Sequence, residues 1–105
     1  MAENLDKIRS IIKRYLKILE QNNIAVEKSY LFGSYARGTA SEDSDIDIAI
    51  VSRNFKGDRF LDRRLIVPLR RQIDRRLEPR PFRSKDFHKS DPLALEILEN
   101  GIEMS

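Results

Sequence analysis

The fold of this chain is decided by Gly33-Ser34-Tyr35-Ala36-Arg37-Gly38 and, ten residues after the Gly-Ser pair, by Asp45-Ile46-Asp47-Ile48-Ala49-Ile50-Val51. The first string follows a short apolar run with a glycine, which lets the backbone turn and come close to a ligand. The second is rich in β-branched residues that alternate with acids at its start, as is typical of a strand. A turn suited to phosphate is therefore predicted a short loop upstream of two carboxylates suited to a metal.

The two aspartates are expected on one face of their strand, because residues i and i+2 of a strand point the same way. Asp45 and Asp47 then project together while Ile46 projects into a core. A rise of about 3.3 Å per residue puts the two acids roughly 6–7 Å apart. Two anions so close repel unless a cation lies between them. Magnesium is the usual cation beside phosphates, and two such ions can activate a hydroxyl and stabilise departing pyrophosphate.

Three residues of the turn are candidate nucleotide ligands. Gly33 allows close backbone approach, and Ser34 offers a hydroxyl and is expected to cap a short helix. Arg37 supplies a permanent cation that can pair with a phosphate. A Gly-Ser pair alone is usually a plain turn and an Asp-x-Asp alone is usually solvated surface, but together, in strand contexts, they favour a nucleotide site.

The pattern of Gly-Ser, ten residues and Asp-x-Asp resembles the signature of the DNA polymerase β-like nucleotidyltransferase superfamily. The size of the chain and its Gly33–Gly38 string resemble the minimal nucleotidyltransferase (MNT) branch. The resemblance implies an α+β fold, with a short mixed sheet flanked by helices, in one domain over residues 1–105. It also implies that Gly33 and Ser34 contact the triphosphate of ATP and that Asp45 and Asp47 bind magnesium.

A third carboxylate belongs to the family's site, and the resemblance assigns it to Glu78. Glu78 is expected to complete the metal site or to take the proton of the attacking hydroxyl. The two prolines that follow it remove backbone donors, which suits an edge strand. Asp74 and Asp86 are rival positions, and a surface ion pair with an arginine is the alternative role for Glu78.

The resemblance also implies a partner that presents the acceptor, because larger relatives carry extra domains for that purpose. In the MNT family this partner is commonly a helical HEPN-type toxin, and the MNT protein is the antitoxin that adenylylates a tyrosine on it. Two alternatives stay open. One is a non-catalytic antitoxin of the same fold, and the other is a small-molecule nucleotidyltransferase with a separate substrate-binding subunit. A homo- or hetero-oligomer is expected.

Composition excludes several kinds of site. The chain has no cysteine, which rules out disulfides, thiolate metal sites and a cysteine nucleophile. Its single histidine, His88, cannot form a His-rich metal site and is expected to face solvent. Residues 1–14 lack the apolar stretch of a signal peptide, and no run approaches the ~20 apolar residues of a membrane span. A cytoplasmic protein is therefore expected.

Periodicity and breakers place the remaining elements. The predictions are helices over about 3–22, 59–77 and 91–100, strands over about 26–32, 45–52 and 78–83, and a closing strand at 102–104. Pro68 is expected to kink or divide the second long helix. Along one side of that helix an apolar residue recurs at every fourth position: Leu61, Leu65, Leu69, Ile73 and Leu77. Ile11 and Ile18 widen the apolar face of the first helix, for a core contact or a partner.

The segment 59–83 is far more basic than the chain, whose net charge is only +3. Its arginines are Arg59, Arg63, Arg64, Arg70, Arg71, Arg75, Arg76, Arg80 and Arg83. Three interpretations stay open: a solvated face with local ion pairs, a docking face for an acidic protein, and contact with nucleic-acid phosphates. Nucleic acid is not favoured, because only Phe60 is available for base stacking on the helix.

Overall fold

The computed structural model describes residues 4–105. Its elements, in chain order, are α1 (Leu5–Gln21), β1 (Lys28–Phe32), α2 (Ser34–Arg37), β2 (Ile46–Val51), α3 (Arg59–Ile66), the 3-10 helix η1 (Val67–Gln72), β3 (Leu77–Phe82), the 3-10 helix η2 (Ser84–Asp86), α4 (Pro92–Asn100) and β4 (Ile102–Glu103). Most bounds lie within two residues of those predicted. Residue 3, where the prediction began the first helix, lies outside the described residues.

The strands form one mixed sheet in the order β3-β2-β1-β4. β1 pairs antiparallel with both β2 and β4, whereas β2 pairs parallel with β3. β3 therefore lies at an edge, as its two prolines predicted, because an edge strand tolerates missing donors on its open side. The predicted α+β fold with a short mixed sheet is confirmed.

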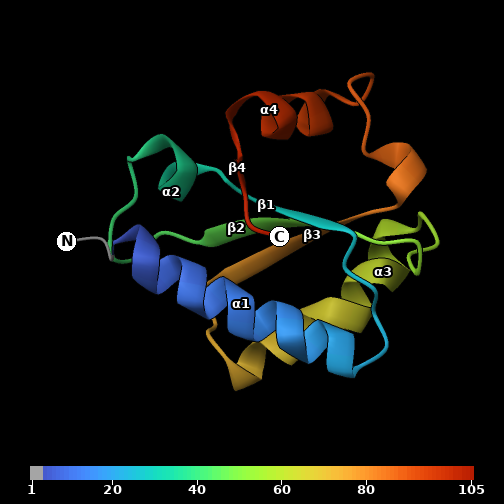
Figure 1. Cartoon of the computed structure of the whole chain (residues 1–105), viewed down its shortest axis with the longest axis horizontal. Helices are drawn as coiled ribbons and strands as arrows, with labels where there is room; N and C mark the ends of the chain where they lie inside the picture. The colour runs from blue at the N-terminus through green and yellow to red at the C-terminus, as the bar shows by residue number, and fades with distance from the viewer. Residues whose placement is uncertain (1–3) are drawn as a thin grey trace.

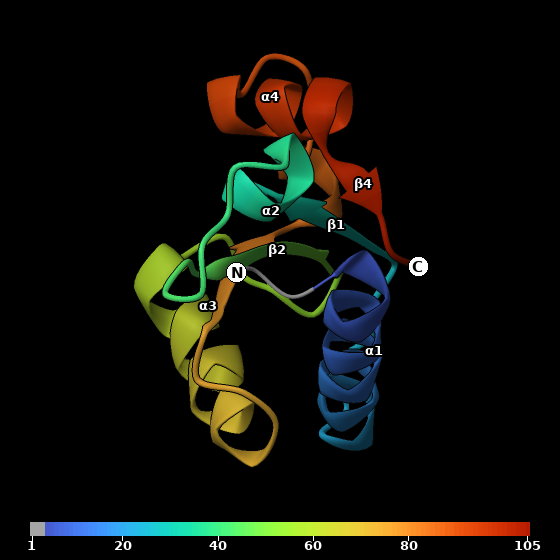
Figure 2. The same ribbon diagram turned by 90° about the vertical axis from the view of Figure 1, so that its left-hand side faces the viewer.

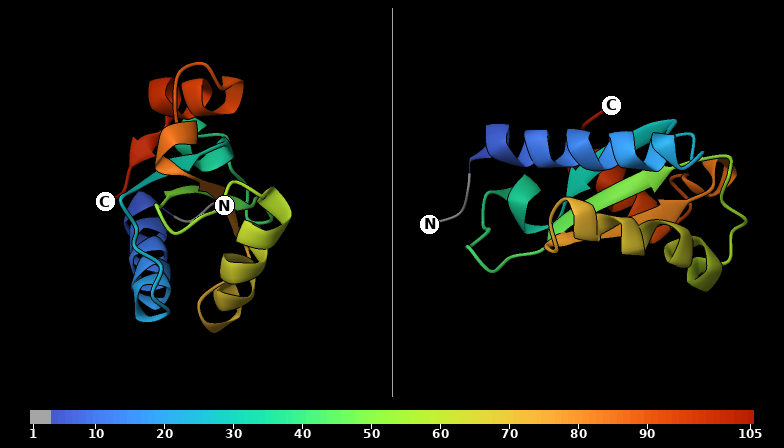
Figure 3. Two further views of the ribbon diagram at one scale, coloured as in Figure 1. Left: turned by 90° about the vertical axis from the view of Figure 1, so that its right-hand side faces the viewer. Right: turned by 90° about the horizontal axis from the view of Figure 1, so that it is seen from below.

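Helices cover both faces of the sheet (Figures 1 and 2). α1 and α3 lie on one face and α4 lies on the other, while α2 is a single turn at the end of β1. Two further views place α1 and the α3–η1 segment on the same side of the strands (Figure 3). The larger apolar cluster fills the space between the sheet and α1, and a smaller one lies under α4 around Tyr30, Ala49 and Ile97.

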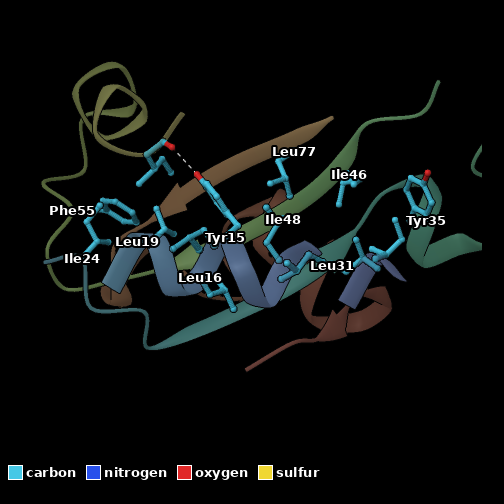
Figure 4. Close-up of a cluster of buried hydrophobic side chains, with 14 residues drawn as sticks. Tyr15, Leu16, Leu19, Ile24, Leu31, Tyr35, Ile46, Ile48, Phe55 and Leu77 are labelled. Carbon is cyan, nitrogen blue, oxygen red and sulfur yellow. Dashed lines mark hydrogen bonds between the residues drawn. The ribbon is translucent and has the colours of Figure 1, made fainter. Parts of the chain in front are cut away.

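α1 is the main cover of the larger cluster. Its buried side chains recur at helical spacing: Ile8, Ile12, Tyr15, Leu16 and Leu19. The side chain of Asn4 caps the helix by accepting from the backbone N–H of Lys7 at 3.0 Å. The hydroxyl of Tyr15 crosses the core to donate to the carbonyl of Ile66, 2.7 Å away (Figure 4). Because Ile66 ends α3, this bond ties the two helices together. Ile11 packs against the cluster, which is the core contact expected of it.

The apolar side predicted for the second long helix is not a single buried face. Pro68 divides the helix as predicted, but the α-helix ends at Ile66 and Leu77 already belongs to β3. α3 buries Asp62 and Ile66, one residue out of step with the leucines, and leaves Leu61 and Leu65 46% and 50% exposed. η1 has three residues per turn, so a repeat of every fourth residue cannot stay on one face from α3 into η1.

Asp62 explains why α3 adopts this phase. Its carboxylate, 3% exposed, accepts from the backbone N–H groups of Lys56 and Gly57 at 2.9 Å each. These bonds hold the turn between β2 and α3, where Gly57 has φ +88°. The burial of Asp62 was not predicted from the sequence, where the apolar repeat lies on the leucines instead. No helix within residues 4–105 has the length and apolar character needed to cross a membrane.

Candidate active site

The candidate site starts at the end of β1, where Gly33 lies directly against Asp47. Phe32 and Asp47 are Cα partners across the antiparallel pair, so the residue after Phe32 falls beside that aspartate. Gly33 has φ +74° and ψ −149°, a conformation essentially restricted to glycine. A Cβ built on Gly33 would overlap Oδ2 of Asp47. The glycine therefore brings bare backbone against the carboxylate, and its close approach to a ligand stays a prediction.

Ser34 is the first residue of α2, not its cap. The N-cap position is taken by Gly33, and no side-chain hydrogen bond caps the helix. The prediction that Ser34 caps this helix is wrong, because its backbone is already helical and its side chain lies a residue too late. Within residues 4–105 the Ser34 hydroxyl has no hydrogen bond, so it is free to bind a ligand.

α2 is anchored by Tyr35, which is 5% exposed and belongs to the larger core cluster (Figure 4). Its hydroxyl accepts from Nη1 of Arg76 at 3.3 Å. The chain then leaves α2 at Gly38, whose φ is +76°, and turns back at Ser41 and Ser44. In that turn the Ser44 hydroxyl accepts from the Ser41 N–H at 2.8 Å. The ten-residue spacing is thus one helical turn plus a return loop that delivers Asp45 to β2.

Asp45 and Asp47 lie on the α4 side of β2. Ile46 and Ile48 are fully buried in the cluster under α1, whereas Ala49 belongs to the cluster under α4. Since side chains alternate along a strand, both aspartates share the face of Ala49. Asp45 is exposed and Asp47 is half-buried. Across residues 4–105, neither carboxylate has a hydrogen bond or ion pair with another side chain or the backbone.

The pKa of Asp47 is raised above its ordinary value. Burial is the largest cause, and the negative charges of Asp45 and Glu78 add to it. Arg80 and Arg37 act in the opposite direction, with smaller effects. The negative charges of Asp45 and Glu78 therefore disfavour the charged form of Asp47, which has no partner among the described residues. A bound cation offsets such repulsion.

Glu78 lies beside Asp47 in the sheet, but its carboxylate is bound by two arginines. It is the Cα partner of Asp47 across the parallel β2–β3 pair. Its carboxylate is bound by Nη2 of Arg63 at 2.9 Å and by Nη1 of Arg70 at 3.4 Å. Among the described residues, no three acids or histidines lie close enough to form a metal site, so Glu78 does not join Asp45 and Asp47. Its role as the third carboxylate stays a prediction.

The two arginines also close the open edge of β3. Arg70 donates to the carbonyl of Leu77 at 2.9 Å, and Arg63 donates to the carbonyl of Pro79 at 3.3 Å. These carbonyls would otherwise present an unpaired strand edge. The ion pair that the sequence offered as the alternative role for Glu78 is therefore present, and it has a structural purpose.

The rival acids are both engaged in ion pairs. Asp74 is bonded by Arg76 through Nε and Nη2, at 3.1 and 2.9 Å, and these bonds lower the pKa of Asp74. Asp86 is bonded by Arg83, which likewise lowers the pKa of Asp86. Neither acid is among the groups that shift the pKa of Asp47. The structure gives them no part in the candidate site.

One residue of the site was not singled out from the sequence. Arg80 lies two residues beyond Glu78 on β3, pairs with Ala49 of β2, and lowers the pKa of Asp47. It appeared only as one of many arginines in the basic segment. Period-two alternation on the predicted strand 78–83 was the signal that would have placed it beside Glu78, on the face of the aspartates.

The residues present fit magnesium. Asp45 and Asp47 offer unpaired carboxylate oxygens, and magnesium is commonly held by one or two carboxylates together with substrate phosphates and water. Gly33, the Ser34 hydroxyl and Arg37 lie on the adjoining turn, where phosphate oxygens would need donors. The arrangement suits a metal–triphosphate complex and the positioning chemistry of phosphoryl and nucleotidyl transfer.

The sequence profile of the family described as Nucleotidyltransferase domain matches residues 12–93. That range contains the turn, both aspartates and Glu78. The chain belongs to the nucleotidyltransferase domain family. The match confirms the superfamily that the Gly-Ser and Asp-x-Asp pattern indicated.

Individual relatives match this chain over a shorter stretch than the family profile does. A provisional protein adenylyltransferase of Methanocaldococcus jannaschii, MJ1379, is 44% identical over 48 residues, which is 46% of this chain and 47% of that protein. Protein adenylyltransferase MntA of Thermococcus cleftensis is 44% identical over 46 residues, 44% of this chain and 46% of that protein. The matched stretch spans about half the length of these relatives. Their names agree with the minimal branch that the sequence resembles.

Solved structures agree with the fold over nearly the whole chain. A chain in the crystal structure of a toxin-antitoxin with AMP-PNP has a TM-score of 0.66 at 23% identity, covering 92% of this chain and 72% of that one. A provisional nucleotidyltransferase from Sulfolobus solfataricus has a TM-score of 0.59 at 20% identity, covering 94% and 77%. At these identities the likeness shows the fold alone.

Proposed function

We propose that this chain transfers AMP from ATP to a hydroxyl of a partner protein, with magnesium held at Asp45 and Asp47. The observation that carries the proposal is the state of these two carboxylates. Asp47 adjoins the backbone of Gly33 and has a raised pKa, and neither carboxylate has a protein partner within residues 4–105. A half-buried carboxylate without an ion pair, such as Asp47, is destabilised in its charged form. We infer that it is kept unpaired because it binds a ligand.

The reaction follows from the proposed positions of the groups. The acceptor oxygen attacks the α-phosphorus of ATP, the bond to the bridging oxygen breaks, and pyrophosphate leaves with the negative charge. When bound, magnesium supplies charge neutralisation at the phosphates. Gly33 and Ser34 hold the triphosphate through backbone N–H and hydroxyl, and Arg37 pairs with a phosphate oxygen. The protein contributes positioning and electrostatics, which provide most of the catalysis in such transfers.

The acceptor's proton needs a base, and Glu78 is our proposal for it. Its carboxylate lies between Arg63 and Arg70, so it must turn from them toward the face of Asp47. Both pairs are partly exposed, which makes them weak enough to exchange. A general base of this kind typically contributes about 10²- to 10⁴-fold to the rate.

The partner is proposed to be a toxin, of the helical HEPN type. Support comes from relatives named protein adenylyltransferase and from the fold neighbour, which is a toxin-antitoxin chain. In this proposal the chain is the antitoxin and the acceptor is a side-chain hydroxyl on the toxin, so that modification neutralises it.

The test is label transfer with magnesium and ATP labelled at the α-phosphate, with a lysate of the source cells supplying the proposed toxin as acceptor. Wild-type protein is expected to label the toxin, whereas Asp45→Asn and Asp47→Asn are expected to leave it unlabelled. Asp43→Asn removes an exposed acid from the same loop and serves as the matched control with full activity. ATP labelled at the γ-phosphate must give no label, because only the AMP moiety is transferred. Transfer of γ-label, or equal labelling by Asp47→Asn, would contradict the proposal.

A non-catalytic antitoxin of the same fold is the second candidate, and the ion pairs of Glu78 favour it. An acid paired with two arginines is a weaker base, and a protein that neutralises its toxin by contact needs none. Toxin rescue in cells separates the two. If Asp47→Asn folds, binds the toxin and still neutralises it, contact alone is sufficient and the catalytic proposal fails.

A further inference from the structure

The outer side of α3 carries an apolar surface that the proposed reaction does not use. Phe60 is 69% exposed, Leu61 46% and Leu65 50%, which makes them the most exposed large apolar residues among those described. They all belong to α3, a helix of eight residues, and Leu61 and Leu65, four residues apart, are neighbours on its surface. We call Phe60, Leu61 and Leu65 the α3 patch. Isolated exposed leucines need no explanation, but a contiguous set on one helix marks an interaction site.

The α3 patch borders a preformed hollow of about 360 Å³, lined by Lys56, Leu61, Asp62, Arg64 and Leu65. The floor of the hollow is rigid, because the carboxylate of Asp62 is buried and bonded to two backbone N–H groups of the turn before α3. The guanidinium carbon of Arg64 lies 5.7 Å from the ring centroid of Phe60. The α3 patch therefore combines the Phe60 ring, which contacts the Arg64 cation, with the hollow beside Leu61 and Leu65.

The rim of the hollow is positively charged. Lys56 and Arg64 line it and are exposed, and Arg59 is exposed on the first turn of α3. The acids nearby are committed to backbone bonds, since Asp58 caps α3 by accepting from the N–H of Leu61 and Asp62 is buried. Lys56, Arg59 and Arg64 outnumber Asp58 and Asp62, so the net charge of this surface is cationic, and a partner that fits it must present apolar side chains flanked by carboxylates.

The same charge argues against a second copy of this chain as the occupant. A two-fold contact through α3 would bring Arg59 and Arg64 of one copy against the same residues of the other, with like charges opposed. Nucleic acid fits no better, because two leucines offer nothing to phosphate and Phe60 is the only ring available for stacking.

We propose that the α3 patch docks a protein partner through an acidic, apolar segment whose side chains enter the hollow beside Leu61 and Leu65. α3 covers the sheet face opposite the one that carries Asp45 and Asp47, so docking leaves those carboxylates open (Figure 2). The docking surface is independent of the proposed chemistry, and it holds whether or not nucleotide transfer occurs.

The test replaces Leu65 with the photo-crosslinking residue benzoylphenylalanine and irradiates the full chain in a lysate of its source cells. Leu98 of α4 is the matched control position, because it is also an apolar helix residue, 38% exposed, on the other sheet face. Crosslinked peptides are then identified by mass spectrometry. The expected product is one protein, captured from position 65 and not from 98, through a segment with apolar residues flanked by Asp or Glu.

Binding of that identified protein is then measured with purified variants. The double change Leu61→Glu with Leu65→Glu is expected to weaken binding by at least about 30-fold, as for loss of a buried anchor. Arg64→Glu is expected to weaken it about 5- to 10-fold, with the effect shrinking at high salt. Leu98→Glu and Asp47→Asn should bind as wild type does, and unchanged thermal unfolding shows that each variant is folded.

Four crosslinking results would overturn the proposal. They are a crosslink to a second copy of this chain, a nuclease-sensitive product, the same product from positions 65 and 98, and no product from position 65. Retained binding in the Leu61→Glu, Leu65→Glu protein would overturn it too. The docking proposal predicts that the Asp47→Asn protein still binds its partner. If this variant loses label transfer while binding is intact, the result bears on the catalytic proposal alone.

Discussion

Asp47 and Glu78 are neighbours in register on adjacent strands, yet the protein treats the two acids in opposite ways. Asp47 has no partner among the described residues, and burial raises its pKa. Glu78 is bound by two arginines that also close the edge of β3. A paired acid contributes to the fold, whereas an unpaired, half-buried one costs stability and is retained for what it binds. In our proposal, this difference separates the acid that holds the ligand from the acid that supports the fold.

The largest expected effect is on activity in Asp47→Asn. If Asp45 and Asp47 hold the metal as proposed, removing one of the two carboxylates should lower the rate of AMP transfer by at least about 10²-fold, as for other losses of transition-state charge stabilisation. The variant should unfold no more easily than wild type at neutral pH, because the lost charge had no partner. Label transfer and thermal unfolding measure the two effects. A fall in stability with activity retained would reverse the roles assigned to Asp47.

The next effect is expected in Gly33→Ala, which tests the contact between backbone and carboxylate. A side chain at this φ and ψ costs about 1–3 kcal/mol, and its Cβ would displace Asp47. Both stability and activity should fall. Gly38→Ala is the matched control, because Gly38 also has positive φ but nothing lies within 4 Å of an added Cβ. It should lose about 1 kcal/mol through backbone strain and keep its activity. Equal activities of the two variants would remove the close-approach argument.

Glu78→Gln tests the second acid of the comparison, the one that is paired with arginines. Losing the ion pairs with Arg63 and Arg70 should lower the free energy of unfolding by about 1 kcal/mol or less, because both pairs are partly exposed. If Glu78 is the base, transfer should also slow by about 10²-fold or more. Urea unfolding and label transfer separate these contributions. A Glu78→Gln protein with full activity would leave Glu78 a structural residue only.

The smallest effect is the pH dependence of stability without magnesium. Asp47 has a raised pKa, so the folded state holds its proton more tightly, and this group's contribution falls as pH rises from its ordinary pKa to the raised one. Asp74 has a lowered pKa, so its contribution is present above the ordinary pKa and is lost as pH falls through the lowered one. At neutral pH, Asp47→Asn should therefore stabilise and Asp74→Asn destabilise, with both differences vanishing in acid. Differences of the same sign in both variants would contradict the assignment.

Local chemistry made the segment 33–47 predictable. A glycine needing positive φ, a strand of alternating acids and isoleucines, and a fixed spacing each act within a few residues, so they place Gly33 and Asp47 correctly. What failed depends on distant contacts. Asp62 is buried because it holds a turn, and this burial leaves Leu61 and Leu65 of α3 exposed, while η1 after Pro68 ends the fourfold repeat.

The charges of the basic segment were equally hard to assign from the sequence. Arg63 and Arg70 bind Glu78 and the β3 edge, Arg76 binds Asp74, and Arg80 faces Asp47. These are four different tasks within one run of arginines. Only the tertiary positions of α3, η1 and β3 distinguish them, since identical side chains carry the same local signal.

The most direct test of the contrast between the two acids is calorimetric titration with magnesium and α,β-methylene ATP, whose α–β linkage cannot be cleaved. We predict that wild-type protein and Glu78→Gln bind with affinities within about 3-fold of each other, whereas Asp47→Asn binds at least about 10-fold more weakly, a loss of about 1.4 kcal/mol. Binding by Asp47→Asn as tight as wild type, or an equal loss in Glu78→Gln, would contradict the claim that the unpaired aspartate holds the metal–nucleotide complex.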